Sequence, residues 1–276
     1  MNTTTRAVEA NGTGSGRRGL AKRDFLPALI VVVALIAIGV FVAATTHAHS
    51  FYYPLGLFSY VMGWTGLPLA YPLLAVAVFV LPFSQKMRHR HIFYTRVRRS
   101  IQSSLIRAAV TNAAVAFCAF FIFVFVIFCF VFYVQPALGL THFDTFAAGT
   151  YPEDFQLSRM TELLKVSPLV YGLTYAAWAG MNASMWASVG LVAVLTIHNR
   201  FFALALPLVL FIALGFILGA LGGTSAQVAP WSLWVLFGIR QVSMLPAIVT
   251  LALFVVAISG ATFIAIARAD HLSNLR

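Results

Sequence analysis

The run "AAVTNAAVAFCAFFIFVFVIFCFVFYV" occupies residues 108–134 and carries no charged side chain. Eight of its 27 residues are phenylalanine. A helix that spans a bilayer needs about 20 predominantly apolar residues, so this run predicts a transmembrane helix. Its two cysteines, Cys118 and Cys129, would lie about 16 Å apart on that helix. This separation is too large for a disulfide bond, and we interpret both as packing residues.

The whole chain has the same character. It is 276 residues long, 61% hydrophobic and 9% charged, with a mean hydropathy of +0.91. A soluble domain carries roughly 25% charged residues, so the composition indicates a polytopic membrane protein. Residues 1–23 are polar and basic, and their composition predicts a disordered cytoplasmic tail. The apolar run after them is too long for a signal peptide, so residues 24–276 are expected to form a single transmembrane domain.

Six runs of the chain satisfy the length rule for a membrane span. The sequence therefore predicts an all-α polytopic membrane protein with six transmembrane helices. They are expected at residues 25–45, 65–83, 108–134, 168–197, 201–221 and 244–267.

The basic residues orient these spans. With the N-terminus inside, fifteen of the 18 Lys and Arg residues lie on the inner side and three on the outer side. Inner loops of membrane proteins carry the excess of Lys and Arg. We therefore predict that both termini are cytoplasmic.

Two predicted outer segments are apolar but too short to span. Residues 46–64 are rich in aromatic side chains and predict an interfacial belt. Residues 230–244, "PWSLWVLFGIRQVSM", include Trp231, Trp234 and Arg240. A spanning helix there would place the C-terminus outside, so we predict a short re-entrant or interfacial hairpin between the fifth and sixth spans.

The connection after the second span is strongly basic. Residues 81–100, "LPFSQKMRHRHIFYTRVRRS", hold six Lys or Arg residues and no acid. In a soluble protein such a block would suggest nucleic acid, but between two spans it first sets topology. Phe93, Val97, Ile101 and Leu105 recur every four residues and indicate one apolar face of a helix. The segment is either a lipid-headgroup-facing loop or a docking helix for a cytoplasmic partner, and its size favours docking.

The fourth span carries a small residue at every fourth position: Gly172, Ala176, Gly180, Ser184 and Ser188. Such a ribbon lets helix backbones approach closely in lipid, so it predicts helix packing within or between subunits. A pathway lining is the other interpretation, and its candidate residues are Thr174, Asn182 and Ser184.

Signals of catalysis and of ion coupling are missing. The central parts of the predicted spans hold no Asp, Glu, Lys or Arg, although ion-coupled carriers usually place ionisable groups there. No P-loop, G-x-S-x-G or H-E-x-x-H pattern occurs. His47, His49 and His142 share the outer side without the spacing of a metal site. We therefore expect no catalytic residue, no metal and no cofactor in this chain.

Six spans, cytoplasmic termini, the basic loop and the Trp-rich hairpin form one arrangement. It resembles the membrane subunits of ABC-2-type transporters, the small bacterial permeases that pair with a separate ATPase. The segments that carry the resemblance are "LPLAYPLLAVAVFVLPFSQKMRHRHIFYTRVRRS" before the third span and "PWSLWVLFGIRQVSMLP" before the last. The family's loop commonly includes acidic residues and a glycine, and this loop has neither.

The resemblance implies a multi-pass protein of the bacterial cytoplasmic membrane that exports a hydrophobic or amphipathic cargo. The first cytoplasmic loop of the family couples to the ATPase. Carried over, this role falls on Gln85, Arg88, His89, Phe93, Arg96, Val97 and Arg99. The hairpin at Trp231, Trp234 and Arg240 would cap the outer end of the pathway.

The partners that the resemblance implies are an ATP-binding cassette subunit, which would hold ATP and Mg, a second permease chain, identical or related, and membrane lipid. Nucleic acid is not an expected partner. The alternatives are a membrane anchor or scaffold that recruits a cytoplasmic complex through its basic loop, or a secondary carrier.

Overall fold

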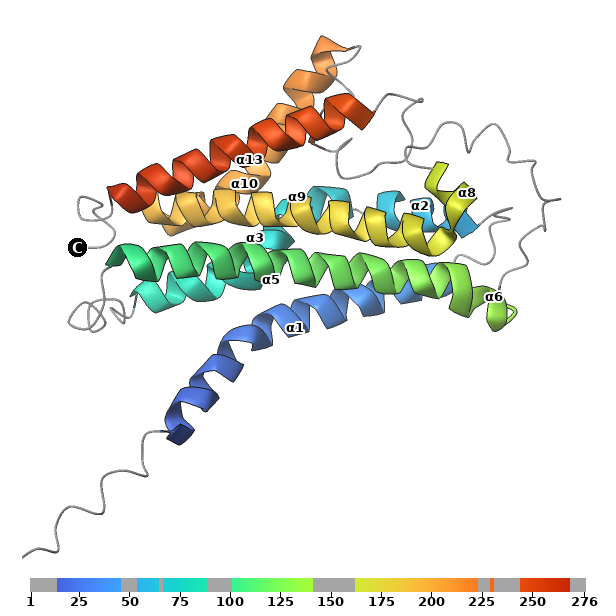
Figure 1. Cartoon of the computed structure of the whole chain (residues 1–276), viewed down its shortest axis with the longest axis horizontal. Helices are drawn as coiled ribbons and strands as arrows, with labels where there is room; N and C mark the ends of the chain where they lie inside the picture. Colours follow the sequence, from blue (N-terminus) through green and yellow to red (C-terminus); the bar gives the residue numbers. More distant parts are fainter. Residues whose placement is uncertain are drawn as a thin grey trace, which may run out of the picture.

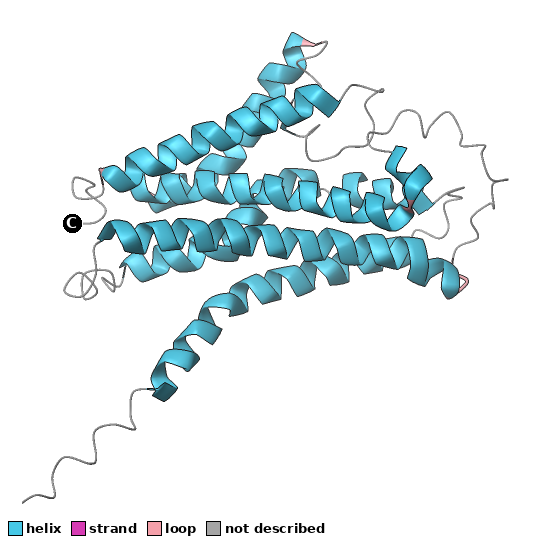
Figure 2. Cartoon of the chain, in the orientation of Figure 1, coloured by secondary structure: helices cyan, strands magenta, loops and turns pink. Residues whose placement is uncertain are grey.

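The structure is a computed structural model, and it describes residues 14–45, 54–64, 67–88, 101–140, 162–222, 229–230 and 244–268. In these residues every regular element is a helix (Figure 2). The elements are α1 (Gly14–Thr45), α2 (Pro54–Trp64), α3 (Leu67–Arg88), α5 (Ile101–Cys129), the π-helical turn η2 (Phe130–Val134), α6 (Gln135–Ala137), α8 (Glu162–Val166), α9 (Pro168–Thr196), α10 (Arg200–Leu221) and α13 (Met244–Ala267).

Five helices of the described part are long and apolar enough to cross a membrane. They coincide with the first, third, fourth, fifth and sixth predicted spans, and their apolar stretches cover Ala28–Thr45, Gln102–Ala137, Pro168–Thr196, Arg200–Leu221 and Leu245–Ala267. The prediction of an all-helical membrane protein is therefore confirmed for the described residues.

The second predicted span, residues 65–83, falls on α3. The apolar part of α3 is Leu69–Leu81, which is shorter than a membrane span. The helix α2 precedes it, and the order of contacts shows how the two are placed. Phe58 of α2 packs edge-to-face on Phe128, near the end of α5. Tyr71 of α3 packs in the same way on Phe120, at an earlier position of α5. The helices α2 and α3 therefore lie one after the other along α5, and both run antiparallel to it.

The helix α2 covers residues 54–64, the described part of the segment predicted as an interfacial belt; residues 46–53 lie outside the described residues. Leu57, Phe58, Val61 and Met62 are completely buried. The helix contacts α1, α3 and η2, so these neighbours enclose its apolar side chains within the bundle. Phe58 therefore belongs to the bundle core and not to a belt, whereas Tyr60 is partly exposed.

The helix α1 begins earlier than the sequence predicts. It starts at Gly14, whereas composition predicted a disordered tail over residues 1–23. Leu20, Ala21, Lys22 and Arg23 are good helix formers. A helix already nucleated in the apolar span extends back to Leu20 through such residues at little cost. Helix propensity does not explain the first turns, which contain Gly14, Gly16 and Gly19.

The closest packing in the bundle joins α5 and α9, which run antiparallel. A Cβ atom on Gly172 would overlap the ring of Phe128. A Cβ atom on Gly180 would lie 2.9 Å from the backbone oxygen of Phe117. Further along, the Ser184 hydroxyl donates to the Ala113 carbonyl over 2.8 Å. The small-residue ribbon predicted for the fourth span therefore packs against α5 of the same chain.

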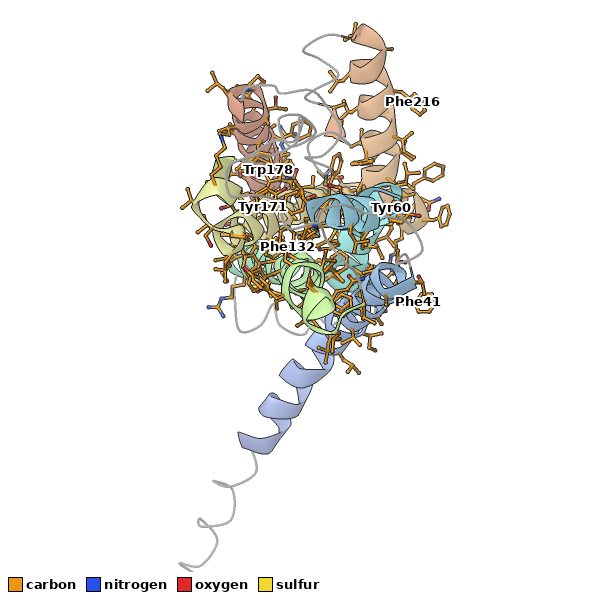
Figure 3. The ribbon with its side chains drawn as sticks, turned by 90° about the vertical axis from the view of Figure 1, so that its right-hand side faces the viewer. Phe41, Tyr60, Phe132, Tyr171, Trp178 and Phe216 are labelled. Carbon is orange, nitrogen blue, oxygen red and sulfur yellow. The ribbon has the colours of Figure 1, made fainter. Side chains whose placement is uncertain are left out.

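An aromatic cluster fills the end of the bundle where α5 continues into η2. Phe58 packs edge-to-face on Phe128 and on Tyr175, with centroid distances of 5.7 and 5.3 Å. Figure 3 shows Phe132 and Tyr171 among the packed elements at this end, whereas Phe41 and Phe216 point outward. The inner rings hold α2, α5 and α9 together, and the outer rings present an apolar surface.

A buried hydrogen bond ties α1 to the same end of the bundle. The Gln135 side chain donates through Nε2 to the Ala43 carbonyl over 3.0 Å. Ala43 lies in the last turn of α1, where carbonyl groups lack partners in their own helix. Gln135 thus gives the Ala43 carbonyl a hydrogen bond that the acyl chains of lipid could not supply.

The helices α10 and α13 lie at the periphery. Figure 1 shows α10 tilting away from the other helices toward its C-terminal end. The side chains of Phe216, Val256 and Phe263 are each at least 70% exposed. Where α13 does pack, it contacts α9 through Leu251 and Phe254. The exposed faces are suited to lipid or to a second membrane chain.

Successive long helices of the bundle run in opposite directions, so their ends gather at two opposite ends of the bundle. In Figure 1 the end of α3, the start of α5, the end of α9 and the end of α13 lie at one end, and α8 lies at the other. The basic connection between α3 and α5 therefore leaves and re-enters the bundle at a single end.

The close approach of α5 and α9 gives a direct prediction. The substitution Gly180→Ala should destabilise the bundle by about 1–3 kcal/mol, because the added methyl group overlaps the α5 backbone and cannot be accommodated without a shift. The measurement is the apparent melting temperature of the purified chain in mild detergent, followed by size-exclusion chromatography after heating.

Gly260→Ala in α13 is the matched control. Nothing lies within 4 Å of a Cβ atom at Gly260, and alanine is the better helix former. This variant should keep or slightly raise the melting temperature. Equal melting temperatures for the two variants would contradict the packing described for Gly180.

Candidate functional site

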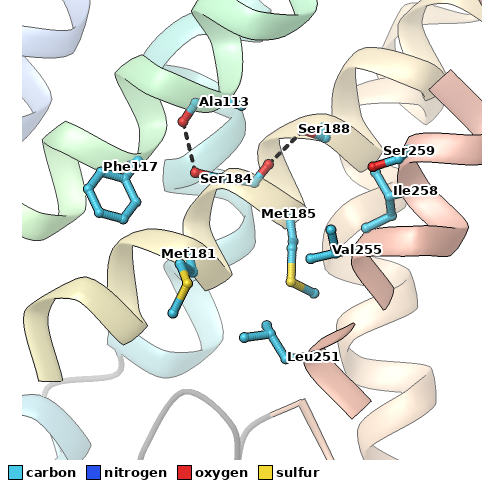
Figure 4. A pocket seen from close by; sticks show the side chains of 10 residues that line it. All are labelled: Ala113, Phe117, Met181, Ser184, Met185, Ser188, Leu251, Val255, Ile258 and Ser259. Atoms are coloured by element: carbon cyan, nitrogen blue, oxygen red, sulfur yellow. Dashed lines mark hydrogen bonds between the residues drawn. The ribbon is translucent and has the colours of Figure 1, made fainter. Parts of the chain in front are cut away.

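A groove of about 240 Å³ lies between α5, α9 and α13 (Figure 4). The helix α5 contributes Ala113 and Phe117, and α9 contributes Met181, Ser184, Met185 and Ser188. The opposite wall comes from α13, with Leu251, Val255, Ile258 and Ser259. The groove is therefore mostly apolar and carries three hydroxyl groups.

The spacing of α9 places its groove residues on one face. Residues three or four apart share a helix face, and Met181, Ser184, Met185 and Ser188 follow this spacing. Met185 is 7% exposed and Met181 is 40% exposed. The groove thus leads from the buried interior to the surface that faces the membrane.

The three predicted pathway residues do not share this groove. Ser184 lines it. The Thr174 hydroxyl donates to the Val170 carbonyl of its own helix over 2.8 Å. Asn182 is 3% exposed, and its Nδ2 donates to the Trp178 carbonyl over 2.9 Å. Of the three candidate pathway residues, Ser184 alone lines this groove, and a transport pathway through them stays a prediction.

The remaining groove residues were not predicted as a site. Ser188 belongs to the small-residue ribbon, so its position on the packed face of α9 could have been inferred. Ser259 and the methionines carry no pattern that distinguishes them from other residues of an apolar span. Their meeting depends on how α13 packs against α9.

The predicted coupling segment is only partly described. Gln85 and Arg88 lie in the last turn of α3, and Ile101 begins α5. His89, Phe93, Arg96, Val97 and Arg99 lie outside the described residues, as do Trp231, Trp234 and Arg240 of the predicted hairpin. Leu105, the last member of the apolar stripe, is buried in a cluster with Val76, Val80 and Val194.

The bundle interior also contains an amide with no partner. Asn112 of α5 is fully buried, and neither its Nδ2 nor its Oδ1 has a hydrogen-bond partner in the part of the chain that the structure describes. Leaving a buried polar group unsatisfied costs roughly 1–3 kcal/mol. Asn112 is therefore a destabilising residue in the conformation described here.

A second groove, between α1 and α5, has a different chemistry. Its volume is about 430 Å³, and its lining includes Leu29, Val32, Val115, Cys118 and Ile122. Its lining side chains are apolar apart from the Cys118 thiol, so it suits an acyl chain of a lipid.

Among the described residues, no three His, Cys, Asp or Glu side chains lie close enough together to hold a metal ion. His47, His49 and His142 lie outside those residues. Comparison with protein-family models, with curated proteins and with solved structures found no match to the chain.

The unpaired amide of Asn112 leads to a prediction. Asn112→Leu should stabilise the bundle by about 1–3 kcal/mol, because it replaces an unsatisfied polar group by an apolar one of similar size. The measurement is again the apparent melting temperature in mild detergent. Asn182→Leu is the control, because it removes an amide that does make a hydrogen bond. A loss of stability for Asn112→Leu, or an equal gain for both variants, would show that Asn112 has a partner.

Proposed function

We propose that the chain is the membrane-spanning permease subunit of an ABC exporter. It moves a hydrophobic or amphipathic cargo by alternating access, driven by a separate ATPase chain that binds ATP and Mg. The supporting observation is the way in which the basic connection joins the bundle. It links the end of α3 to the start of α5, and α5 is the helix that packs most closely against α9.

This connection gives a partner mechanical access to the core. Leu105 lies one turn into α5 and is 3% exposed, packed in a cluster with residues of α3 and α9. A protein that binds residues 89–100 would therefore transmit movement through α5 to the packed centre of the bundle. Packed helices respond to such a force by shifting between discrete arrangements.

The proposal includes six membrane crossings with both termini in the cytoplasm. The second crossing consists of α2 followed by α3, which together contain 33 helical residues. The excess of Lys and Arg in the predicted inner segments supports a cytoplasmic position for the connection between α3 and α5. The bacterial cytoplasmic membrane is part of the proposal through the resemblance to ABC-2-type permeases.

A partner ATPase also supplies the energy source that the spans lack. The central parts of the five long apolar helices hold no Asp, Glu, Lys or Arg. A secondary carrier would normally use such groups to couple transport to ions. Conformational change driven by a bound ATPase needs none of them.

The exposed faces of α10 and α13 support a second permease chain, identical or related. The apolar stretch of α13 is 11% buried and that of α10 is 22% buried. Both values are well below the 67% of α9. A second chain against these faces would enclose a pathway between two bundles.

A specific observation favours one alternative, a membrane anchor that recruits a cytoplasmic complex without transport. The basic segment has neither the acidic residues nor the glycine that are common in the family's coupling loop. A purely basic segment would also suit an acidic protein surface or anionic headgroups.

The test is recovery of a nucleotide-binding subunit with the chain. The chain purified from its native membranes in mild detergent should retain an ATP-hydrolysing partner. Arg96→Glu combined with Arg99→Glu should reduce this recovery at least tenfold, because it reverses two charges in the segment that the partner holds. Mass spectrometry and ATPase activity of the eluate are the measurements.

Lys165→Glu is the control, because it reverses a charge on α8 at the opposite end of the bundle. It should leave recovery unchanged. Unchanged recovery of the ATP-hydrolysing partner with the double variant would show that the basic segment sets only the topology of the chain and does not bind the partner. A partner complex without ATPase activity would favour the anchor.

A further inference from the structure

The hydroxyl groups of the groove between α5, α9 and α13 differ in whether they can donate or accept a further hydrogen bond. A serine hydroxyl has one hydrogen to donate and two lone pairs that accept. The hydrogen of Ser184 is used on the carbonyls of Ala113 and Gly180, at 2.8 and 3.1 Å. The hydrogen of Ser188 is used on the Ser184 carbonyl, at 2.7 Å. Toward the groove, both oxygens can therefore only accept.

Among the groove residues drawn in Figure 4, none shares a hydrogen bond with the hydroxyl of Ser259 on the opposite wall, and this hydroxyl faces the side of α9 that carries Ser188. Its neighbour Thr262 behaves differently and donates to the Ile258 carbonyl over 2.7 Å. Ser259 is therefore free to donate or to accept.

The other walls restrict the charge of a ligand. Phe117, Met185 and Leu251 are apolar, and none of the described residues that line the groove is charged. A charged ligand would lose its hydration without gaining a counter-charge, at a high cost. Met181 and Val255 are 40% and 45% exposed, so a ligand enters sideways from the bilayer.

We propose that this groove binds, from the bilayer, a neutral apolar molecule that presents an O–H or N–H donor to the oxygens of Ser184 and Ser188. Ser259 makes the second hydrogen bond to the same polar group. This inference rests on the proposed function in one respect: if the chain is an exporter subunit, the bound molecule is its cargo. Binding itself requires no ATPase.

The experiment uses the purified full chain in lipid nanodiscs. The probe is a long-chain alcohol with a diazirine in its alkyl chain, and its methyl ether serves as the matched probe without a donor. After irradiation, mass spectrometry should locate the alcohol on residues 181–188 and 251–259. The alcohol should label these residues about fivefold more than the ether, the ratio that one net hydrogen bond supports.

The variant Ser188→Ala/Ser259→Ala should lower the preference for the alcohol over the ether, because only the Ser184 oxygen then remains in the groove to accept the hydrogen bond. Neither substitution removes a hydrogen bond between helices, and Ser259→Ala alone should already reduce the preference. Thr196→Ala is the control, because the Thr196 hydroxyl bonds the Val192 carbonyl of α9 outside the groove. It should keep the full preference.

Equal labelling by alcohol and ether in the unmodified chain would overturn the proposal, as would an unchanged preference in the double variant. Labelling of residues 181–188 by neither probe, together with cross-links between two copies of the chain there, would assign the groove to a second subunit instead. A preference for the alcohol in a chain that recovers no ATPase would keep the binding site and reject the exporter.

Discussion

The bundle depends on the close approach of α5 and α9. In a bilayer, helices gain little from leaving lipid, so their association relies on van der Waals packing and on small residues that let backbones meet. Gly172 and Gly180 provide this approach, because any side chain there would overlap Phe128 or Phe117. The other helices attach to this pair: α3 through the Tyr71 hydroxyl on the Ala179 carbonyl, and α1 through Gln135 on Ala43.

The helices α5 and α9 are tightly packed at the centre of the bundle, whereas α10 and α13 are largely exposed. The proposed transport function and the proposed binding groove both depend on this difference. The centre supplies one wall of the hydroxyl-bearing groove, because Ser184 is held by its hydrogen bond to Ala113. The periphery supplies the other wall through Ser259 of α13. A shift of α13 relative to α9 would open or close the groove. A force on the connection between α3 and α5 would reach the centre directly.

Much of the fold could be predicted from the sequence, because length and hydropathy report directly on membrane spans. The small-residue ribbon of α9 also predicted a packed face, and that face is confirmed against α5. The sequence predicted one span at residues 65–83, whereas the structure has the two shorter apolar helices α2 and α3 in this region. Hydropathy reports how many apolar residues a segment has and does not report where a helix is interrupted. The groove was missed except for Ser184, because the roles of Ser188 and Ser259 depend on hydrogen bonds and contacts that only the packed bundle shows.

We expect the helices packed around α5 and α9 to hold two ends of the bundle on opposite sides of one membrane: the end with the basic connection between α3 and α5, and the end with α8. Cysteine labelling tests it, with Cys118 and Cys129 replaced by alanine and a single cysteine introduced as Lys165→Cys or Arg268→Cys. A membrane-impermeant maleimide applied to intact cells should label Lys165→Cys and not Arg268→Cys, and inverted vesicles should give the reverse. Labelling of both positions from the same side would contradict this arrangement.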